Sequence, residues 1–107
     1  MNKKLLASIG VTAAAAAAAL AVPALAAGPT VRVNDDFFKA KTLRIKPNTT
    51  VRWRWAGEHP HNVKFRSFHS TTKTSGTYRH RFTKRGTYHY VCTIHDGKGM
   101  KGTVIVR

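Results

Sequence analysis

From Thr30 to the end of the chain, apolar and polar residues mostly alternate, and turn-forming residues interrupt the pattern every eight to twelve positions. Alternation with period two is typical of strands that bury one face, whereas a helix would repeat every three to four residues. No helix longer than a turn or two is indicated. The pattern predicts seven strands, at Thr30–Val33, Thr42–Ile45, Thr50–Trp55, Asn62–Phe65, Thr77–Phe82, Thr87–Cys92 and Thr103–Arg107. Seven short strands in one domain favour an all-β, antiparallel sandwich.

The segment 50–55 shows this alternation most clearly. Val51, Trp53 and Trp55 fall on one face of the predicted strand, and Arg52 and Arg54 fall on the other. We expect the first three side chains to point into the core and both arginines to face water, because a half-buried strand separates its apolar and charged residues in this way.

The first 27 residues follow a different pattern. Lys3 and Lys4 precede an apolar, alanine-rich run that ends at a proline and a group of small residues. This is the layout of a secretory signal peptide, with cleavage expected after Ala26 or Ala27. A retained membrane anchor is the alternative, because the run is long enough to span a bilayer. The sequence predicts a leader at 1–27 and one domain at 28–107, exported to the periplasm, the cell envelope or the medium.

The charge of the chain limits its partners. It has 19 lysines and arginines against four acids, and Lys3 and Lys4 lie in the leader, so the predicted domain carries 17 basic residues and a net charge of +13. Such a field attracts an acidic protein surface or an anionic membrane or wall. The basic residues are scattered along alternating strands and do not form a basic arm or helix, which argues against nucleic acid as a partner.

Cys92 is the only cysteine, so no disulfide can form within the chain. It shares a strand face with Tyr88 and Tyr90, which predicts a sulfur at the inner end of that strand. Four explanations remain: a bond to another chain, a reactive thiol, an inert buried residue or a metal ligand. The neighbouring residues favour the last, because Cys92, His95 and Met100 follow one another as Cys-x2-His-x4-Met.

The three side chains of this short loop form a soft ligand set. A thiolate, an imidazole and a thioether favour copper, and one cysteine with two histidines and a weak axial methionine defines the type 1, or blue, copper site. Such a site needs a second histidine. His61, about thirty residues before Cys92, offers one, and His59 is its rival for this role.

With these residues identified, the chain resembles the cupredoxins of the plastocyanin or pseudoazurin type. The resemblance rests on His61-Asn62-Val63, on the lead-in 86–91, on the Cys-x2-His-x4-Met loop with its glycines, and on the final strand 102–106. It implies a Greek-key sandwich in which one copper ion is held by His61, Cys92, His95 and Met100. It also implies that Asn62 ties its strand to the Cys92 loop through hydrogen bonds, which favours His61 over His59. We do not expect the other histidines to be ligands.

The resemblance implies an electron carrier, not an enzyme, that moves single electrons between redox partners by the Cu(I)/Cu(II) couple, with the edge of His95 as the electron port. We expect a monomer whose redox partner has an acidic docking surface, because this chain is basic where plastocyanins bear acidic patches. A protein that stores, delivers or scavenges copper is the alternative. A copper oxidase is disfavoured, because no paired His-x-His spacing exists beyond His59 and His61.

Overall fold

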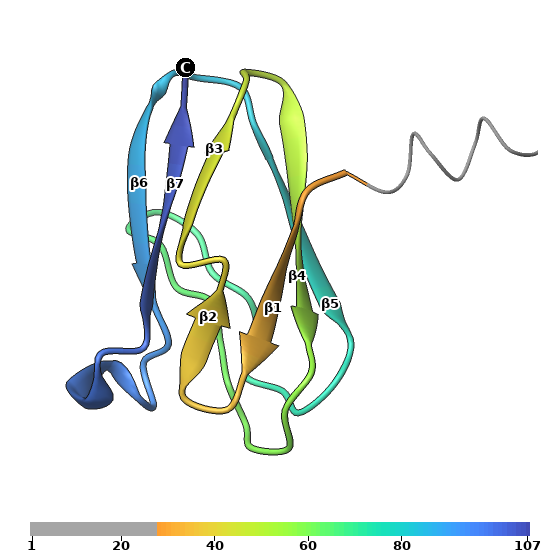
Figure 1. Cartoon of the computed structure of the whole chain (residues 1–107), viewed down its shortest axis with the longest axis vertical. Helices are drawn as coiled ribbons and strands as arrows, with labels where there is room; N and C mark the ends of the chain where they lie inside the picture. Colours follow the sequence, from red (N-terminus) through yellow and green to blue (C-terminus); the bar gives the residue numbers. More distant parts are fainter. Residues whose placement is uncertain (1–27) are drawn as a thin grey trace, which may run out of the picture.

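The computed structural model describes residues 28–107, and the predicted leader at 1–27 lies outside the described residues. Two β-sheets pack face to face (Figure 1). The first has the strand order β2-β1-β4-β5 and the second the order β3-β7-β6. Their bounds are β1 Thr30–Asn34, β2 Phe37–Lys39, β3 Thr42–Ile45, β4 Thr49–Trp55, β5 Thr77–Phe82, β6 Gly86–Val91 and β7 Lys101–Val106. The predicted all-β sandwich is confirmed.

The sequence predicted antiparallel pairing throughout, but each sheet contains both parallel and antiparallel pairs of strands. Strand β1 pairs antiparallel with β2 but parallel with β4, and β3 pairs parallel with β7 while β6 pairs antiparallel with it. The parallel pairs arise because the chain crosses to the second sheet at β3 before it returns to the first at β4. Strands joined by such a crossover run in the same direction, whereas strands joined by a hairpin run in opposite directions.

The predicted strands need two corrections, one strand that was missed and one that is not formed. The structure has a short strand at Phe37–Lys39 that the pattern did not indicate, because only Phe38 of its three residues points inward. The expected strand at Asn62–Phe65 is not formed. Its residues make isolated bridges, with Lys64 facing both His69 and Val91, since the backbone groups of this segment bond to separate neighbours and not to one ladder.

The core lies between the two sheets and is rich in aromatic rings. Trp53 is fully buried, and its ring centroid lies 5.6 Å from those of both Phe65 and Tyr90, in edge-to-face contact. Burial raises the pKa of Tyr90 to about 12. The predicted inward face of β4 is confirmed, since Val51 and Trp55 are also buried. Of the two arginines on the opposite face of β4, Arg52 is half-buried and Arg54 is exposed.

One end of the sandwich collects three connections that are distant in sequence. The β1–β2 turn, the chain after β4 and the β6–β7 connection all lie at the lower end of Figure 1. The β6–β7 connection contains a 3-10 helix, η2 (Asp96–Lys98). In the stretch 28–107, no helix is long and apolar enough to cross a membrane.

Candidate metal centre

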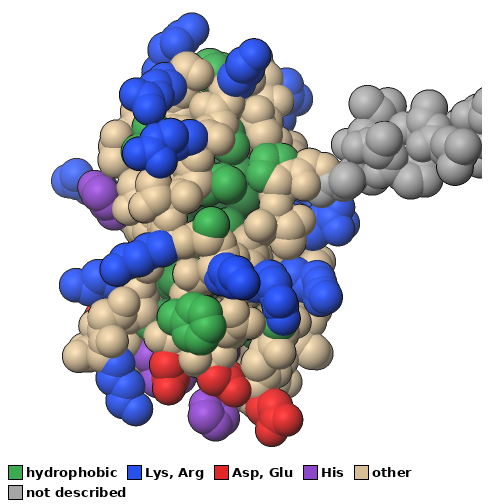
Figure 2. Space-filling view, viewed as in Figure 1, with side chains coloured by type: hydrophobic (Ala, Val, Ile, Leu, Met, Phe, Trp, Pro, Cys, Tyr) green, Lys and Arg blue, Asp and Glu red, His purple; other side chains and the backbone are tan. Residues whose placement is uncertain are grey.

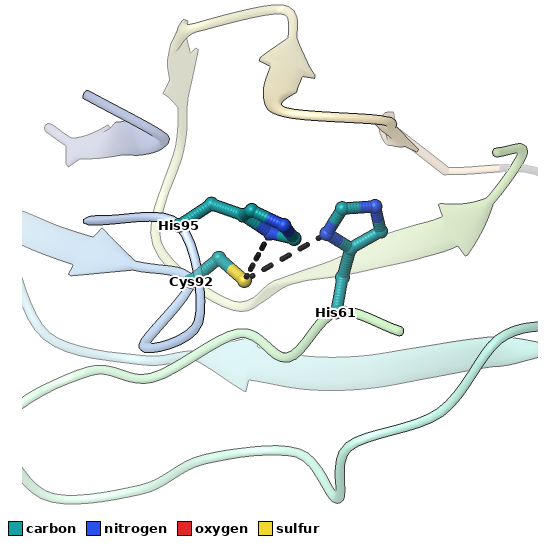
Figure 3. A group of neighbouring side chains, drawn as sticks. All are labelled: His61, Cys92 and His95. Carbon is teal, nitrogen blue, oxygen red and sulfur yellow. Dashed lines mark hydrogen bonds between the residues drawn. The ribbon is translucent and has the colours of Figure 1, made fainter. Parts of the chain in front are cut away.

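At this end of the sandwich, three predicted ligands converge from two segments of the chain (Figure 3). Cys92 Sγ lies 3.7 Å from Nδ1 of His61 and 3.7 Å from Nδ1 of His95. The three donor atoms all lie within 4.8 Å of one another, and this is the only such group of histidine, cysteine and acidic residues in the part of the chain that the structure describes. The Cys92 sulfur is fully buried, as the strand pattern predicted.

The spacing of these atoms suits one shared metal ion. Zinc, a first-row metal like copper, makes bonds of about 2.0 Å to imidazole nitrogen and about 2.3 Å to thiolate. If one bond of each kind meets at the metal at a trigonal angle, the sulfur and the nitrogen lie about 3.7 Å apart. This is the separation of Cys92 Sγ from each Nδ1. One thiolate and two imidazoles are also the trigonal donor set of a type 1 copper site. The residues present therefore fit copper.

His61 is fixed by hydrogen bonds to Trp55, six residues earlier, and to Lys73, twelve residues later. Its backbone N–H and carbonyl both bond to Lys73, at 3.0 Å each, and the indole Nε1–H of Trp55 donates to the same carbonyl at 3.2 Å. Its side chain is fully buried. These bonds replace the strand ladder that the sequence pattern predicted for this segment, and they hold the imidazole at one position in the end of the sandwich.

His95 and Met100 are placed by the short loop that follows Cys92. The backbone N–H of Cys92 donates to the carbonyl of Met100 at 3.0 Å, and that of Met100 donates to the carbonyl of His95 at 3.2 Å. Gly99 ends η2 with φ of 82°, a left-handed conformation that glycine adopts without strain. The loop thereby folds back on Cys92 and buries Met100 completely beside it.

Asn62 links these two segments as the resemblance implied. Its side-chain amide donates to Thr93 Oγ1 at 2.8 Å and to Thr72 Oγ1 at 2.9 Å. Its carbonyl oxygen accepts the backbone N–H of Thr93 at 2.9 Å. The residue after His61 is thus bonded twice to the residue after Cys92, so the two ligands cannot move independently.

The structure separates His61 from its rival. The side chain of His59 is 61% exposed and lies outside the three-residue group, although its ring centroid is 6.5 Å from that of His61. His69 and His89 are exposed, as expected. His80 is half-buried and stacks on Phe68 with ring centroids 3.6 Å apart. Burial lowers its pKa.

Sequence reasoning missed two acids that face the imidazoles. Asp35 Oδ1 lies 3.0 Å from Nε2 of His61, and Asp36 Oδ1 lies 3.4 Å from Nε2 of His95. The backbone N–H of His59, the imidazole of His61 and the backbone N–H of Glu58 hold the pKa of the Asp35 carboxyl well below its usual range. The only sequence signal was the adjacency of two acids in a chain that has four.

The charges of the molecule are therefore unevenly distributed. Figure 2 shows the acidic side chains gathered at the lower end beside histidines, while lysines and arginines are scattered over the rest of the face. Asp35 and Asp36 touch the two imidazoles, Glu58 bonds to Asp35 through its backbone, and Asp96 follows His95. The metal end is less positive than the net charge of the chain suggests.

Comparisons with known proteins agree with this site. A family model described as copper binding proteins, plastocyanin/azurin family, matches residues 29–107. The chain is 39% identical to amicyanin-alpha of Methylorubrum extorquens, over 94% of this chain and 92% of that protein, and 32% identical to plastocyanin of Scenedesmus fuscus, over 73% and 98%. A purple cupredoxin from Nitrosopumilus maritimus superposes with a TM-score of 0.67 at 25% identity, covering 74% of this chain and 99% of that chain. An amicyanin variant in its Cu(I) form gives 0.68 at 28%, covering 75% and 82%.

Proposed function

The chain belongs to the plastocyanin/azurin family of copper binding proteins, and from this premise we propose that it carries single electrons between redox partners through one type 1 copper ion. The observation that carries the proposal is the equal 3.7 Å separation of Cys92 Sγ from Nδ1 of His61 and of His95. Relatives named amicyanin and plastocyanin support a carrier and not an enzyme.

His61, Cys92 and His95 would hold the copper, with Met100 as a weaker fourth ligand. Bound copper supplies a one-electron Cu(I)/Cu(II) couple. The protein's own contribution is to limit rearrangement when the charge changes. Burial of His61, Cys92 and Met100 keeps water from the ligands, and the hydrogen bonds of Asn62 keep the two ligand segments together.

His95 would provide the path for the electron. Its side chain is 14% exposed, whereas that of His61 is fully buried. Of the two imidazoles, only that of His95 reaches the surface, so a partner that docks over this end comes closest to the copper through its ring. The exposed side chain of Ile94, the preceding residue, offers an apolar contact there.

The role of Met100 can be tested through the reduction potential. A thioether is a soft ligand that favours Cu(I), and an amide oxygen is a harder ligand that favours Cu(II). Met100→Gln is expected to retain copper and to lower the potential. A potential equal to that of the wild-type protein would show that Met100 is not a ligand.

The proposal also includes export of the protein and a redox partner with an acidic surface. The leader pattern at 1–27 supports a place in the periplasm or outside the cell. The charge of +13 on residues 28–107 supports a redox partner with an acidic docking surface, bound by a monomer. Because the metal end carries the acids, the acidic area of the partner would face the basic flanks. The rate of association should fall as salt is added, and a rate that is insensitive to salt would contradict this part.

The electron self-exchange rate tests the proposed function against copper storage or delivery. A carrier should exchange electrons rapidly between its own Cu(I) and Cu(II) forms and retain copper in both forms in the presence of a mild chelator. Slow exchange, together with ready release of copper to an acceptor, would favour the copper-handling alternative. Both measurements use the purified protein and need no knowledge of its partner.

A further inference from the structure

The carboxylate of Asp35 contacts the nitrogen of His61 that points away from the copper site. Nδ1 of His61 faces Cys92 Sγ at 3.7 Å, and Nε2 faces Asp35 Oδ1 at 3.0 Å. The imidazole is fully buried, while the Asp35 side chain is 32% exposed. Both ring nitrogens of His61 therefore have a defined partner, one on the metal side and one on the solvent side.

The protein holds this carboxylate in place with its backbone. The N–H of Glu58 lies 3.0 Å from both carboxylate oxygens, and the N–H of His59 donates to Oδ1 at 2.9 Å. The carboxylate also lies directly against Gly57, where a Cβ atom would overlap with its oxygen and carbon atoms. The loop 57–59 thus binds the Asp35 carboxylate through two backbone N–H groups, and position 57 must be glycine because any Cβ atom there would overlap with Asp35.

The next residue repeats the arrangement more weakly on the other imidazole. Asp36 Oδ1 lies 3.4 Å from Nε2 of His95, and the Asp36 side chain is 43% exposed. Asp36 has φ of 71°, a left-handed conformation that aspartate and asparagine tolerate better than most residues. One tight turn between β1 and β2 therefore directs two neighbouring carboxylates at the two imidazoles of the site.

We propose that Asp35 is a positioning residue that accepts the Nε2–H of His61, leaves Nδ1 free for copper, and makes the site favour Cu(II) over Cu(I). The inference rests on the proposed function. A carboxylate that accepts the second ring N–H fixes the tautomer of a metal-binding histidine and makes it a stronger ligand. Its negative charge also stabilises the oxidised site more than the reduced one, because Cu(II) carries one more positive charge.

This effect opposes the field of the rest of the chain. Seventeen basic residues and a net charge of +13 on residues 28–107 disfavour the more highly charged Cu(II) state. A carboxylate in direct contact with a ligand acts over a much shorter distance than the scattered surface lysines and arginines, and it is screened less by salt. Asp35 should therefore influence the copper more than any single basic side chain on the flanks.

The first test compares Asp35→Asn with Glu58→Gln. Both variants remove one negative charge from the same end of the molecule, but only the Asp35 side chain contacts the His61 ring. For Asp35→Asn we expect Cu(II) affinity to fall about tenfold or more. Cu(I) affinity should fall less, and each tenfold difference between the two raises the potential by about 59 mV. Glu58→Gln should change the affinity ratio by less than about twofold, since its side chain is exposed to screening solvent.

A second variant separates the position of the carboxylate from its charge. Gly57→Ala keeps every charged group but displaces the Asp35 carboxylate, together with the backbone of Asp35, whose nitrogen the new Cβ atom would also overlap. It is expected to change the Cu(II)/Cu(I) affinity ratio in the same direction as Asp35→Asn. Because it retains the charge, a shift in this variant cannot be attributed to the net charge of the protein.

The third measurement uses the metal-free protein. Nitrogen-15 spectra of the His61 side chain should show a protonated Nε2 and an unprotonated Nδ1 in the wild-type protein, and this preference should weaken in Asp35→Asn. The inference is overturned if Asp35→Asn matches Glu58→Gln in the affinity ratio and leaves the His61 tautomer unchanged. A wild-type protein without an intense blue band would instead overturn the proposed function, and the tautomer would still report the Asp35 contact.

Discussion

The two halves of the proposed copper site are built in different ways. The half around His61 is held by three separate segments of the chain, through the backbone of Lys73, the indole of Trp55 and the carboxylate of Asp35 in the β1–β2 turn. The half around His95 lies in one loop, closed by backbone bonds between Cys92 and Met100 and between His95 and Met100. A ligand fixed by the tertiary fold depends on the whole sandwich, whereas a ligand fixed by a short loop depends on a few local bonds.

Exposure follows the same division. The His61 side chain is fully buried and the His95 side chain is 14% exposed. The buried half suits the task of keeping the ligand geometry constant, and the exposed half suits electron transfer to a partner.

The largest effect is expected from removal of the buried imidazole. His61→Ala in the metal-free protein should lower the free energy of unfolding by roughly 2–4 kcal/mol, because it leaves a cavity at a fully buried position. His95→Ala should cost about 1 kcal/mol, the centre of the range for single substitutions, because its side chain is only partly buried. Urea unfolding of both proteins measures the difference. Equal losses would contradict the division into a buried and a local half.

The second largest loss of stability is expected from removal of the Asn62 side chain, which links the two halves. Asn62→Ala removes three hydrogen bonds and leaves the backbone N–H of Thr93 without its side-chain acceptor, so stability should fall by about 2 kcal/mol. Thr72→Ala removes one of the three and should cost about 1 kcal/mol or less. The copper spectrum of Asn62→Ala should also broaden, since the residues that follow His61 and Cys92 are no longer joined, although the Lys64–Val91 backbone bridge still links the two segments. An unchanged spectrum and stability would show that Asn62 does not link them.

A smaller effect is expected within the loop itself. Gly99 has φ of 82°, so Gly99→Ala should cost about 1 kcal/mol through left-handed strain. Gly97 has open space around its Cα, and Gly97→Ala should change stability by less than about 0.5 kcal/mol. Gly99→Asn should recover part of the loss, because asparagine tolerates this conformation. If alanine is tolerated equally at both positions, the turn at Gly99 is not needed to close the loop.

The smallest effect concerns a histidine outside both halves. Burial against Phe68 lowers the pKa of His80 below its ordinary value near 6.5, so the unfolded chain takes up a proton first as the pH falls. The contribution of His80 to stability should be constant above about pH 6.5 and decline from there toward the lowered pKa of the folded state. In metal-free protein, His80→Gln should lose this part of the decline, and His89→Gln, at an exposed position, should retain it. Identical pH curves for the two variants would contradict the assignment.

The sequence pattern predicted the parts of the fold that depend on burial. Alternation in 50–55 and in 87–92 placed Trp53 and Cys92 correctly, because a half-buried strand separates its residues by polarity. The strand Phe37–Lys39 escaped prediction because three residues are too few to show a period. The segment 62–65 was wrongly predicted as a strand, since its alternation reflects burial of Val63 and Phe65 without a continuous ladder.

The site was predictable only as far as its chemistry was visible in the chain. Cys92, His95 and Met100 stand in one loop, and the residue after His61 supported it over His59. Asp35 could not be found in this way. Its role depends on the β1–β2 turn folding against the loop after β4, a contact between residues 26 positions apart that no local pattern records.

The visible absorption and electron paramagnetic resonance spectra of the protein titrated with Cu(II) test the central claim most directly. A Cys92 thiolate bound to copper with two imidazoles should give an intense blue band that saturates at one equivalent, with unusually small copper hyperfine splitting, and Cys92→Ser should abolish it. A pale spectrum with ordinary hyperfine splitting would mean that the thiolate does not bind copper, and it would contradict the assignment of a type 1 site.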